Sequence, residues 1–504
     1  MSSLLTLEEY QSIAESMSFP GGAFIDGKAR SALSGNTFES LNPSNGKSLG
    51  MIALCGQEDV DHAVEKARDA FEDRRWAAVH PSERKATLIR LCKLIKRNQH
   101  ELAVLESLES GKPIAEVETV DIPEAIHCIS WHAETADKLY DQVAPTGEDA
   151  IAMIVREPIG VVAAVLPWNF PILMMAWKIG PALAAGNSVI IKPAEETSMT
   201  ALRIAELAVE VGVLNVVTGI GESTGKMIGL HPGIDMVSFT GSTEVGKYFL
   251  KYSADSNMKK VVLECGGKNP CVVMSDAENL DTVAQHVTNA VFWNMGENCS
   301  SNSRLIVDKE VSESLMERVL HRLREWRTGD PLDPSNRLGA IVSRSQYRRI
   351  LDYIETSPKE GAELIAGGNA IELQNGFFIE PTIFTGVTPD MTIAKEEVFG
   401  PVLAVITVSG EDQAVSIANE TCYGLAASVF TSNLKRAHRM SRAIRAGTVT
   451  VNCFGEGDIT TPFGGYKQSG FGGRDNSIHA HDQYTEMKTI WIDVSDQDID
   501  DAIN

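Results

Sequence analysis

The chain has 504 residues, of which 43% are hydrophobic and 22% charged, and its formal net charge is −23. This length allows a large core and about three domains, and no apolar run approaches the roughly 20 residues of a membrane span. The negative charge disfavours nucleic acid and anionic membranes as partners, so a small neutral or cationic molecule is the more suitable ligand.

The eight cysteines are scattered, without a C-x-x-C pair or a spacing typical of metal ligands. The first residues do not have the basic, hydrophobic and small-residue segments of a signal peptide. We therefore expect a cytoplasmic protein in a reducing compartment, with no bound metal.

The first part of the chain mixes hairpins and helices. Turn signals alternate with short apolar runs over residues 24–56, which predicts hairpins at a domain edge. Helical periodicity follows over 60–109 and 122–140, and residues 142–156 have the pattern of an extended excursion.

A regular alternation of strands and helices occupies residues 159–274. Its apolar strands are predicted at 160–166, 188–191, 214–218, 236–239 and 260–263. Fully apolar strands alternating with helices predict a parallel sheet covered on both faces, with ligands bound at the carboxyl ends of the strands.

Polar residues gather where these strands end. Gly241 and Ser242 open a helix, whose free amides suit a phosphate group. Lys192 and Glu195 leave another strand together; a carboxylate there bonds a ribose diol and repels a 2′-phosphate, which favours NAD over NADP. The alternative, plain turn glycines, has about equal weight at this point, because no G-x-G-x-x-G follows the first strand.

A second alternating series begins after residue 274, and its first loop carries Cys299. A helix over 280–293 stops at Gly296, which places Cys299 on a polar loop among small hydroxyl residues. An open thiol suits a nucleophile, whereas most cysteines without a disulfide are core residues.

Three residues together suggest a reaction. A Cys299 thiolate that attacks a carbonyl makes an oxyanion, which Asn169 and the Cys299 amide can stabilise. Hydride loss to nicotinamide then gives a thioester, and Glu264 at a strand end is the candidate base for its hydrolysis. Each residue alone has a simpler explanation as a turn, surface or core residue. Their predicted position in one crevice favours a catalytic role for all three.

Seven motifs in order resemble the NAD(P)-dependent aldehyde dehydrogenase family along nearly the whole chain. They are PWNFP (167–171), KPAE (192–195), FTGSTEVG (239–246), LECGGK (263–268), the Cys299 loop with Arg304, EEVFGP (396–401) and PFGGYKQSG (462–470). The resemblance implies Cys299 as nucleophile, Glu264 as base and Asn169 as oxyanion donor. It also implies a proton relay of Lys178 with Glu486, and a cofactor site of Trp168, Lys192, Glu195, Gly241, Ser242, Glu397 and Phe399.

The family architecture implies an α/β fold of two doubly wound parallel-sheet domains plus a small β oligomerisation element. We expect an NAD-binding domain over 1–136 and 156–266, a catalytic domain over 267–470, and an oligomerisation element over 137–155 and 471–504. A homodimer or homotetramer follows from this resemblance.

Two departures from the family pattern concern local structure. The segment before Val213 is shortened between a helix and a strand. Glu297 stands where the family usually has glutamine, and its carboxylate disfavours a thiolate at Cys299 unless it points away.

The expected substrate is an aldehyde from polyamine breakdown. Residues 454–461 and the stretch after the last motif are most similar to the branch that oxidises γ-glutamyl-γ-aminobutyraldehyde and related amino-aldehydes. Candidate substrate residues are apolar walls and acids for a cationic or amide-bearing tail, namely Trp177, Trp293, Phe454, Glu456, Asp458 and Glu109.

Other functions remain open from the sequence. They are a broad-specificity or betaine-type aldehyde dehydrogenase, and a non-redox Cys-dependent acyl transferase or hydrolase, for which no partner histidine is recognisable. A CoA-acylating enzyme is disfavoured by the base at Glu264, and an inactive binding protein by the complete set of catalytic residues.

Overall fold

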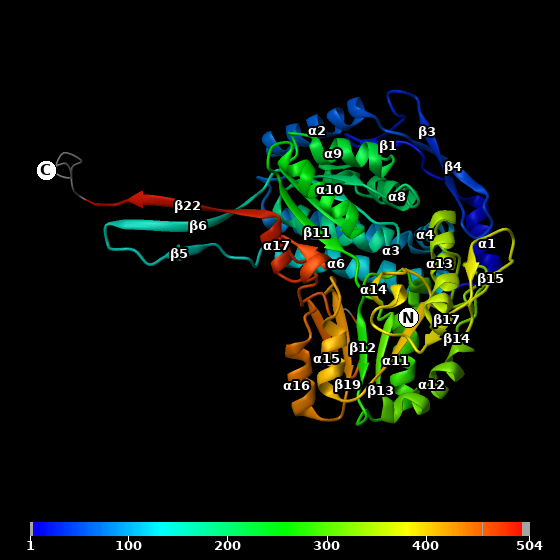
Figure 1. Ribbon diagram of the computed structural model, residues 1–504. Coiled ribbons are helices and arrows are strands. Elements are labelled where there is room, and N and C mark those ends of the chain that lie inside the picture. The colour runs from blue at the N-terminus through cyan, green and yellow to red at the C-terminus, as the bar shows by residue number, and fades with distance from the viewer. Residues whose placement is uncertain (1–3, 456, 496–504) are drawn as a thin grey trace.

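The computed structural model describes residues 4–455 and 457–495 and shows two α/β lobes with a projecting arm (Figure 1). The chain begins with α1 (Leu7–Ser16), whose capping box of Thr6 and Glu9 supplies the first hydrogen bonds of the helix. A hairpin of β3 (Thr37–Leu41) and β4 (Ser48–Ala53) lies at the outer edge of the first lobe. No helix in the described ranges has both the length and the apolar character to cross a membrane.

The first lobe contains an eight-stranded sheet. Its five central strands are parallel, and β2, β1 and β21 at the edges are antiparallel. The prediction of a parallel sheet is confirmed for the centre, and the antiparallel edges are additional. In spatial order the strands are β2 (Lys28–Arg30), β1 (Ala23–Ile25), β9 (Leu214–Val216), β8 (Ser188–Lys192), β7 (Val161–Val165), β10 (Met236–Gly241), β11 (Lys260–Cys265) and β21 (Gly470–Phe471).

Both faces of this sheet are buried. Val161 and Ala163 of β7 belong to one apolar cluster, whereas Val162 and Ala164 between and beside them belong to another. Alternate side chains of a strand point to opposite faces, so helices must cover both. They are α2 (Gln57–Glu72), α3 (Pro81–Arg97), α4 (Gln99–Ser110), α6 (Ile122–Thr135), α7 (Pro171–Ala185), α8 (Met199–Leu207), α9 (Lys226–Leu230) and α10 (Thr243–Ala254).

The second lobe is built on a seven-stranded sheet that is parallel except for β14 at one edge. In spatial order its strands are β14 (Glu363–Ala366), β17 (Thr382–Thr385), β18 (Val402–Val408), β13 (Arg304–Asp308), β12 (Pro270–Val273), β19 (Ala426–Phe430) and β20 (Thr448–Val451). Its helices are α11 (Leu280–Phe292), α12 (Lys309–Leu323), α13 (Arg344–Thr356), α14 (Thr392–Lys395), α15 (Glu411–Asn419) and α16 (Leu434–Ala443). The two predicted α/β lobes are therefore confirmed.

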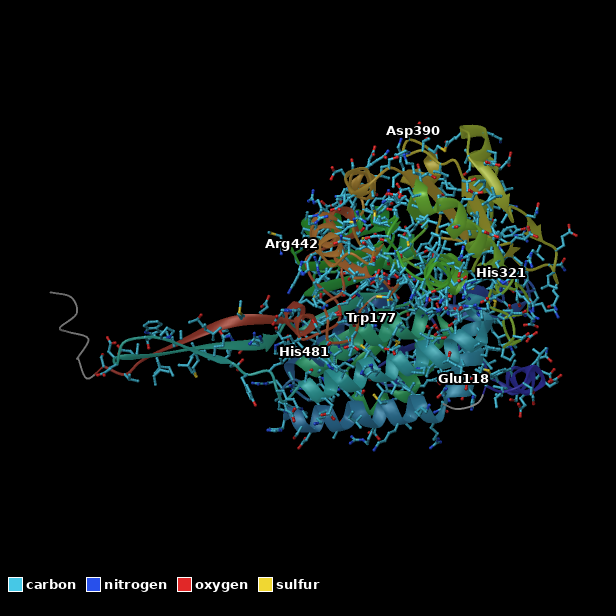
Figure 2. The ribbon with its side chains drawn as sticks, turned by 90° about the horizontal axis from the view of Figure 1, so that it is seen from below. Glu118, Trp177, His321, Asp390, Arg442 and His481 are labelled. Carbon is cyan, nitrogen blue, oxygen red and sulfur yellow. The ribbon has the colours of Figure 1, made fainter. Side chains whose placement is uncertain are left out.

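The arm is a three-stranded antiparallel sheet that extends away from both lobes (Figures 1 and 2). It consists of β5 (Gln142–Ala144), β6 (Ala150–Pro158) and β22 (Thr485–Asp493). The expected boundary at residue 471 needs correction, because Phe471 pairs with Leu263 in the first lobe and α17 (His479–Gln483) packs on α7. Only β22 joins the arm from that segment, and residues 496–504 of the predicted element lie outside the described residues.

Candidate active site

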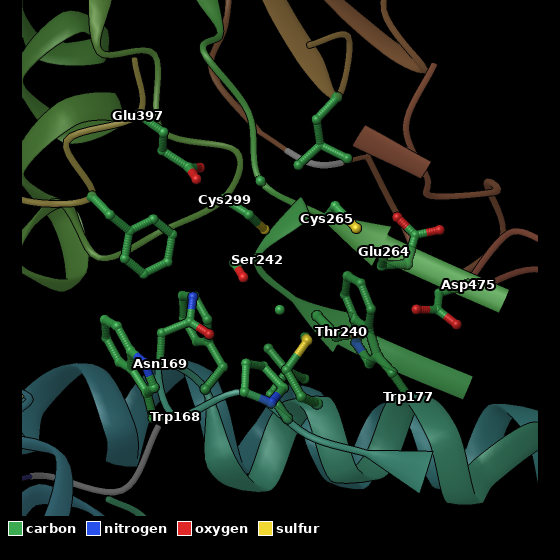
Figure 3. A pocket seen from close by; sticks show the side chains of 18 of the residues that line it. Trp168, Asn169, Trp177, Thr240, Ser242, Glu264, Cys265, Cys299, Glu397 and Asp475 are labelled. Atoms are coloured by element: carbon green, nitrogen blue, oxygen red, sulfur yellow. The ribbon is translucent and has the colours of Figure 1, made fainter. Parts of the chain in front are cut away.

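A deep pocket lies at the carboxyl ends of the first-lobe strands, where the second lobe faces them (Figure 3). Parallel strands bring their carboxyl ends to one edge, so residues distant in sequence meet there. The pocket is lined by residues from both lobes, including Trp168, Asn169, Trp177, Ser242, Glu264, Trp293, Cys299, Glu397, Phe399 and Asp475.

Cys299 enters this pocket from the loop after α11. The helix ends at Phe292, and a tight turn over Trp293–Gly296 follows. Gly296 has φ +70°, and a Cβ there would lie 2.2 Å from the carbonyl oxygen of Gly400, so only glycine fits. Cys299 is half-buried. Its backbone carbonyl accepts a hydrogen bond of 2.7 Å from Asn269 Nδ2.

Asn169 comes from the loop between β7 and α7. Its side chain is buried, and Nδ2 donates a 2.9 Å hydrogen bond to the carbonyl oxygen of Glu297, two residues before Cys299. The amide donor predicted for an oxyanion is thus tied to the nucleophile loop and lines the same pocket.

Glu264 lies near the end of β11 and is buried. Neither carboxyl oxygen accepts a hydrogen bond from another side chain among the described residues, and the Gly465 backbone amide acts on the carboxyl to lower its pKa. Burial, followed by the nearby Asp475 charge, raises the pKa of Glu264 well above its usual range, against the opposing effect of Lys178. A carboxyl with no side-chain hydrogen bond and a raised pKa has the properties of a general base or acid.

The predicted pairing of Lys178 with Glu486 is wrong. Lys178 Nζ lies 2.7 Å from Asp475 Oδ2, and both side chains are buried beside Glu264. Glu486 is exposed on the arm strand β22, opposite Glu157 of β6. Sequence reasoning missed Asp475, although a carboxylate directly after Gly472, Gly473 and Arg474 was an available signal.

The start of α10 provides a candidate phosphate site. Ser242 is the N-cap of this helix and accepts a hydrogen bond from the Val245 amide, as the sequence predicts for a helix opening here. A Cβ at Gly241 would lie 2.6 Å from the ring of Phe239, so this strand end requires glycine. The remaining free amides of the first turn can bind an anion.

Glu397 and Phe399 line the pocket from the second lobe. Glu397 accepts a 2.7 Å hydrogen bond from the Gly267 amide, and burial raises its pKa to about 7. Phe399 and Trp168 form an edge-to-face pair with ring centroids 5.2 Å apart. A Cβ at Gly266 would lie 2.1 Å from a Glu397 carboxylate oxygen, which explains a glycine at this close approach.

Lys192 and Glu195 lie at the end of β8, next to β7. Lys192 Nζ donates to the Pro193 carbonyl at 2.9 Å and lies 3.3 Å from Glu195 Oε2. Lys192 is buried, whereas Glu195 remains half-exposed. This pair lies at the same sheet edge as Ser242, but neither residue is among the pocket lining above.

A second cavity shares part of its wall with the first. Leu173, Trp177 and Trp293 line both cavities, so the two meet at these side chains. Phe454 and Asp458 line the second cavity, as expected for substrate residues. Sequence reasoning missed other charged residues of this mouth, which are Glu124, His127 and Arg337.

One expected substrate residue lines neither cavity, and another cannot be placed. Glu109 is buried at the start of α8, where it accepts hydrogen bonds from the Met199 and Thr200 amides at 2.8 and 2.9 Å. It therefore caps a helix, and its proposed contact with substrate is wrong. Glu456 lies outside the described residues.

The two departures from the family pattern have simple structural outcomes. The Glu297 carboxyl accepts a 3.2 Å hydrogen bond from the Val342 amide, and burial raises its pKa well above the usual range. The side chain does not line the pocket, so it points away from the nucleophile. The shortened segment is a single turn over Val209–Val211 that ends at Gly212, with φ +70°.

Comparisons with known proteins agree with this geometry. The family model "Aldehyde dehydrogenase family" matches residues 30–490. An aminoacetaldehyde dehydrogenase of Pseudomonas aeruginosa is 58% identical over 499 residues, covering 98% of this chain and 100% of the relative. The structure of P. syringae AldA indole-3-acetaldehyde dehydrogenase with NAD+ and IAA has a TM-score of 0.96 at 47% identity, covering 97% and 100% of the two chains.

A third similarity concerns the expected substrate branch. The structure of γ-glutamyl-γ-aminobutyraldehyde dehydrogenase from Burkholderia cenocepacia J2315 has a TM-score of 0.95 at 49% identity, covering 97% of this chain and 100% of that one. The fold and the matching relatives define an oxidoreductase that acts on aldehydes. The chain belongs to the aldehyde dehydrogenase family, as the sequence motifs predict.

Proposed function

We propose that the protein oxidises an amino-bearing aldehyde to its carboxylic acid with NAD, through a covalent intermediate on Cys299. The observation that supports this most is one pocket lined by Cys299, Asn169, Glu264 and Phe399. No histidine lines this pocket in the described part of the chain, which disfavours the non-redox cysteine hydrolase.

The residues present suit a dinucleotide. Ser242 and the α10 amides would hold the pyrophosphate, and Lys192 with Glu195 would hold the adenosine ribose. Glu397 and Phe399 would hold the nicotinamide end, with Trp168 behind Phe399. NAD, when bound, accepts the hydride of the aldehyde, and the Glu195 carboxylate disfavours the 2′-phosphate of NADP.

The nucleophile and its oxyanion donor act at one carbon. The Cys299 thiolate adds to the aldehyde carbonyl and forms a thiohemiacetal. Asn169 Nδ2, held beside the loop by the Glu297 carbonyl, donates to the developing oxyanion together with the Cys299 amide. After hydride loss a thioester remains on Cys299.

Glu264 serves as the base for hydrolysis of this thioester. Its raised pKa makes it a stronger base than an ordinary carboxylate, so in its ionised form it can take a proton from water. The adjacent Lys178 and Asp475 pair offers a route for that proton away from the pocket, in place of the expected Glu486.

Two carboxylates of the second cavity, which is lined by residues of both charge signs, would bind a cationic tail of the substrate. Glu124 and Asp458 are exposed on its wall, which His127 and Arg337 also line. Trp177 and Trp293 would enclose the aliphatic part between these acids and Cys299. Aminoacetaldehyde and γ-glutamyl-γ-aminobutyraldehyde, named for two similar proteins, both carry an amino group.

The arm supports assembly into a homodimer or homotetramer, for which we propose a cytoplasmic location. Met487 and Trp491 of β22 are 77% and 65% exposed on a strand that leaves the body of the molecule. Exposed apolar side chains on a projecting sheet are suited to cover by a second copy. We propose that the three largest sheets correspond to cofactor-binding, catalytic and oligomerisation parts.

The test is NADH or NADPH formation across four aldehydes, with Cys299→Ala as control. The panel is aminoacetaldehyde, γ-glutamyl-γ-aminobutyraldehyde, betaine aldehyde and a simple alkyl aldehyde. The proposal predicts NAD-dependent activity that is highest with the first two and absent from the variant. Equal rates with the alkyl aldehyde would reduce it to a broad-specificity enzyme, and equal rates with NADP would contradict the cofactor preference.

A further inference from the structure

The turn before Cys299 has an unusual backbone. Asn294 has φ 51° and ψ 43°, Met295 has φ 54° and ψ 19°, and Gly296 has φ 70°. Side-chain-bearing residues rarely adopt this left-handed region, and a methionine gains no local hydrogen bond there. Such a turn persists only where neighbouring groups hold it.

Glu116 from the first lobe contacts this turn directly. It is the last residue of the short helix α5 (Ile114–Glu116), just before the π-helical turn Val117–Asp121. Its Oε2 accepts a 3.1 Å hydrogen bond from the Asn294 backbone amide. Because residues 293–299 belong to the second lobe, this hydrogen bond connects the two lobes beside the nucleophile.

Asn294 extends this connection to the oxyanion donor. Its Nδ2 donates to the carbonyl oxygens of Asn169 and Glu297, both at 3.0 Å. The Glu297 carbonyl also accepts the 2.9 Å hydrogen bond from Asn169 Nδ2. Glu116, Asn294 and Asn169 therefore form a continuous chain of hydrogen bonds that ends at the predicted oxyanion donor.

We propose that Glu116 is a positioning residue that sets the relative placement of Cys299 and Asn169 by holding the left-handed turn at Asn294. The inference rests on the proposed roles of Cys299 and Asn169. Glu116 touches neither the Cys299 side chain nor the Asn169 side chain in this network, so it acts through Asn294.

The role of Glu116 is that of a hydrogen-bond acceptor more than that of a charge. Burial raises the pKa of Glu116 to about 8. The Lys112 and Arg337 charges lower this pKa, and the Asp121 charge raises it. A largely neutral carboxyl near pH 7 can be replaced by the neutral amide of glutamine, whose oxygen still accepts from Asn294. Leucine has a similar size but accepts nothing.

The experiment compares Glu116→Gln with Glu116→Leu, and uses Thr119→Ala as the matched control. Thr119 is exposed in the same π-helical turn, and its hydroxyl bonds only the Ala115 carbonyl. For each variant one measures kcat, the KM for NAD, and the rate at which iodoacetamide alkylates Cys299 without substrates. We expect leucine to lower kcat by about 10- to 100-fold and to change the alkylation rate, with the KM for NAD within about twofold because the cofactor residues are untouched.

In Glu116→Gln, kcat and the rate of Cys299 alkylation should be close to those of the natural enzyme. Thr119→Ala should match the natural enzyme in both quantities. The proposal is overturned if Glu116→Leu leaves kcat and alkylation unchanged, or if glutamine and leucine cause equal losses. Should Glu116→Leu not fold, hydrogen exchange in the natural enzyme decides: the Asn294 amide is expected to be protected, and rapid exchange would contradict the proposal. If the natural enzyme forms no NADH while Glu116→Leu still changes the alkylation rate of Cys299, the proposed function is refuted and the positioning role of Glu116 is not.

Discussion

Lys178 Nζ and Asp475 Oδ2 lie 2.7 Å apart as an ion pair whose side chains are both buried beside Glu264. A buried pair of this kind is costly to break, because the remaining partner keeps an uncompensated charge. It also sets the electrostatic environment of the candidate base.

Replacing Asp475 with asparagine is expected to shift the pH dependence of turnover. The Asp475 charge raises the pKa of Glu264 by more than Lys178 lowers it, so removing that charge lowers the pKa even if Lys178 also becomes neutral. Glu264 then ionises at lower pH, and the acidic limb of the kcat profile should move to lower pH. Stability should fall by roughly 3–5 kcal/mol.

Glu486→Gln is the matched control for that variant, because it tests the corrected pairing. Glu486 is exposed on β22, so its kcat profile should overlay that of the natural enzyme. If the pH profile of kcat shifts in the Glu486 variant and not in the Asp475 variant, the relay partner of Lys178 is Glu486, as the sequence predicted.

Glu109→Ala should affect stability and leave substrate binding intact. The carboxyl accepts hydrogen bonds from the Met199 and Thr200 amides at the start of α8, and losing a cap costs about 1–2 kcal/mol. Thermal unfolding should occur at a lower temperature, while the KM for aldehyde in folded enzyme stays the same. A raised KM at unchanged unfolding temperature would contradict the capping role.

Glu124→Gln and Asp458→Asn are expected to weaken binding of amino-aldehydes specifically. Both carboxylates are exposed on the second cavity, so each contributes a modest attraction of about 0.2–1 kcal/mol. The double variant should raise the KM several-fold for aminoacetaldehyde and leave that of an alkyl aldehyde unchanged. Equal changes for both substrates would show that the acids do not select the tail.

Glu195→Gln should relax the cofactor preference. Removing the half-exposed carboxylate beside Lys192 removes repulsion of a 2′-phosphate, so kcat/KM with NADP should rise by about tenfold relative to NAD, or ~1.4 kcal/mol. Glu222→Gln, an exposed position in the neighbouring turn, is the control and should keep the original ratio. An unchanged ratio in the Glu195 variant would remove this residue from cofactor selection.

Much of the pocket was predictable because strand ends are visible in the sequence. Asn169, Ser242 and Glu264 each follow an apolar run, and the carboxyl ends of parallel strands share one edge. The order of the motifs then identified the family and the second lobe.

The errors concern contacts between distant segments. Glu109 caps a helix that begins 90 residues later, and no local pattern indicates such a partner. Glu486 and Asp475 are 11 residues apart, but β22 leaves the body of the molecule while Asp475 stays bonded to the first lobe. Motif context alone cannot distinguish these two paths of the chain.

The most direct measurement of the central claim is rapid-quench turnover of Glu264→Gln with NAD and aminoacetaldehyde, followed by the mass of the Cys299 peptide. Removing the base blocks thioester hydrolysis without touching the nucleophile. The account predicts a burst of about one NADH per active site, little further turnover, and an acyl adduct on Cys299. Steady turnover with an unmodified Cys299 peptide would contradict the role of Glu264 as the base that hydrolyses the thioester.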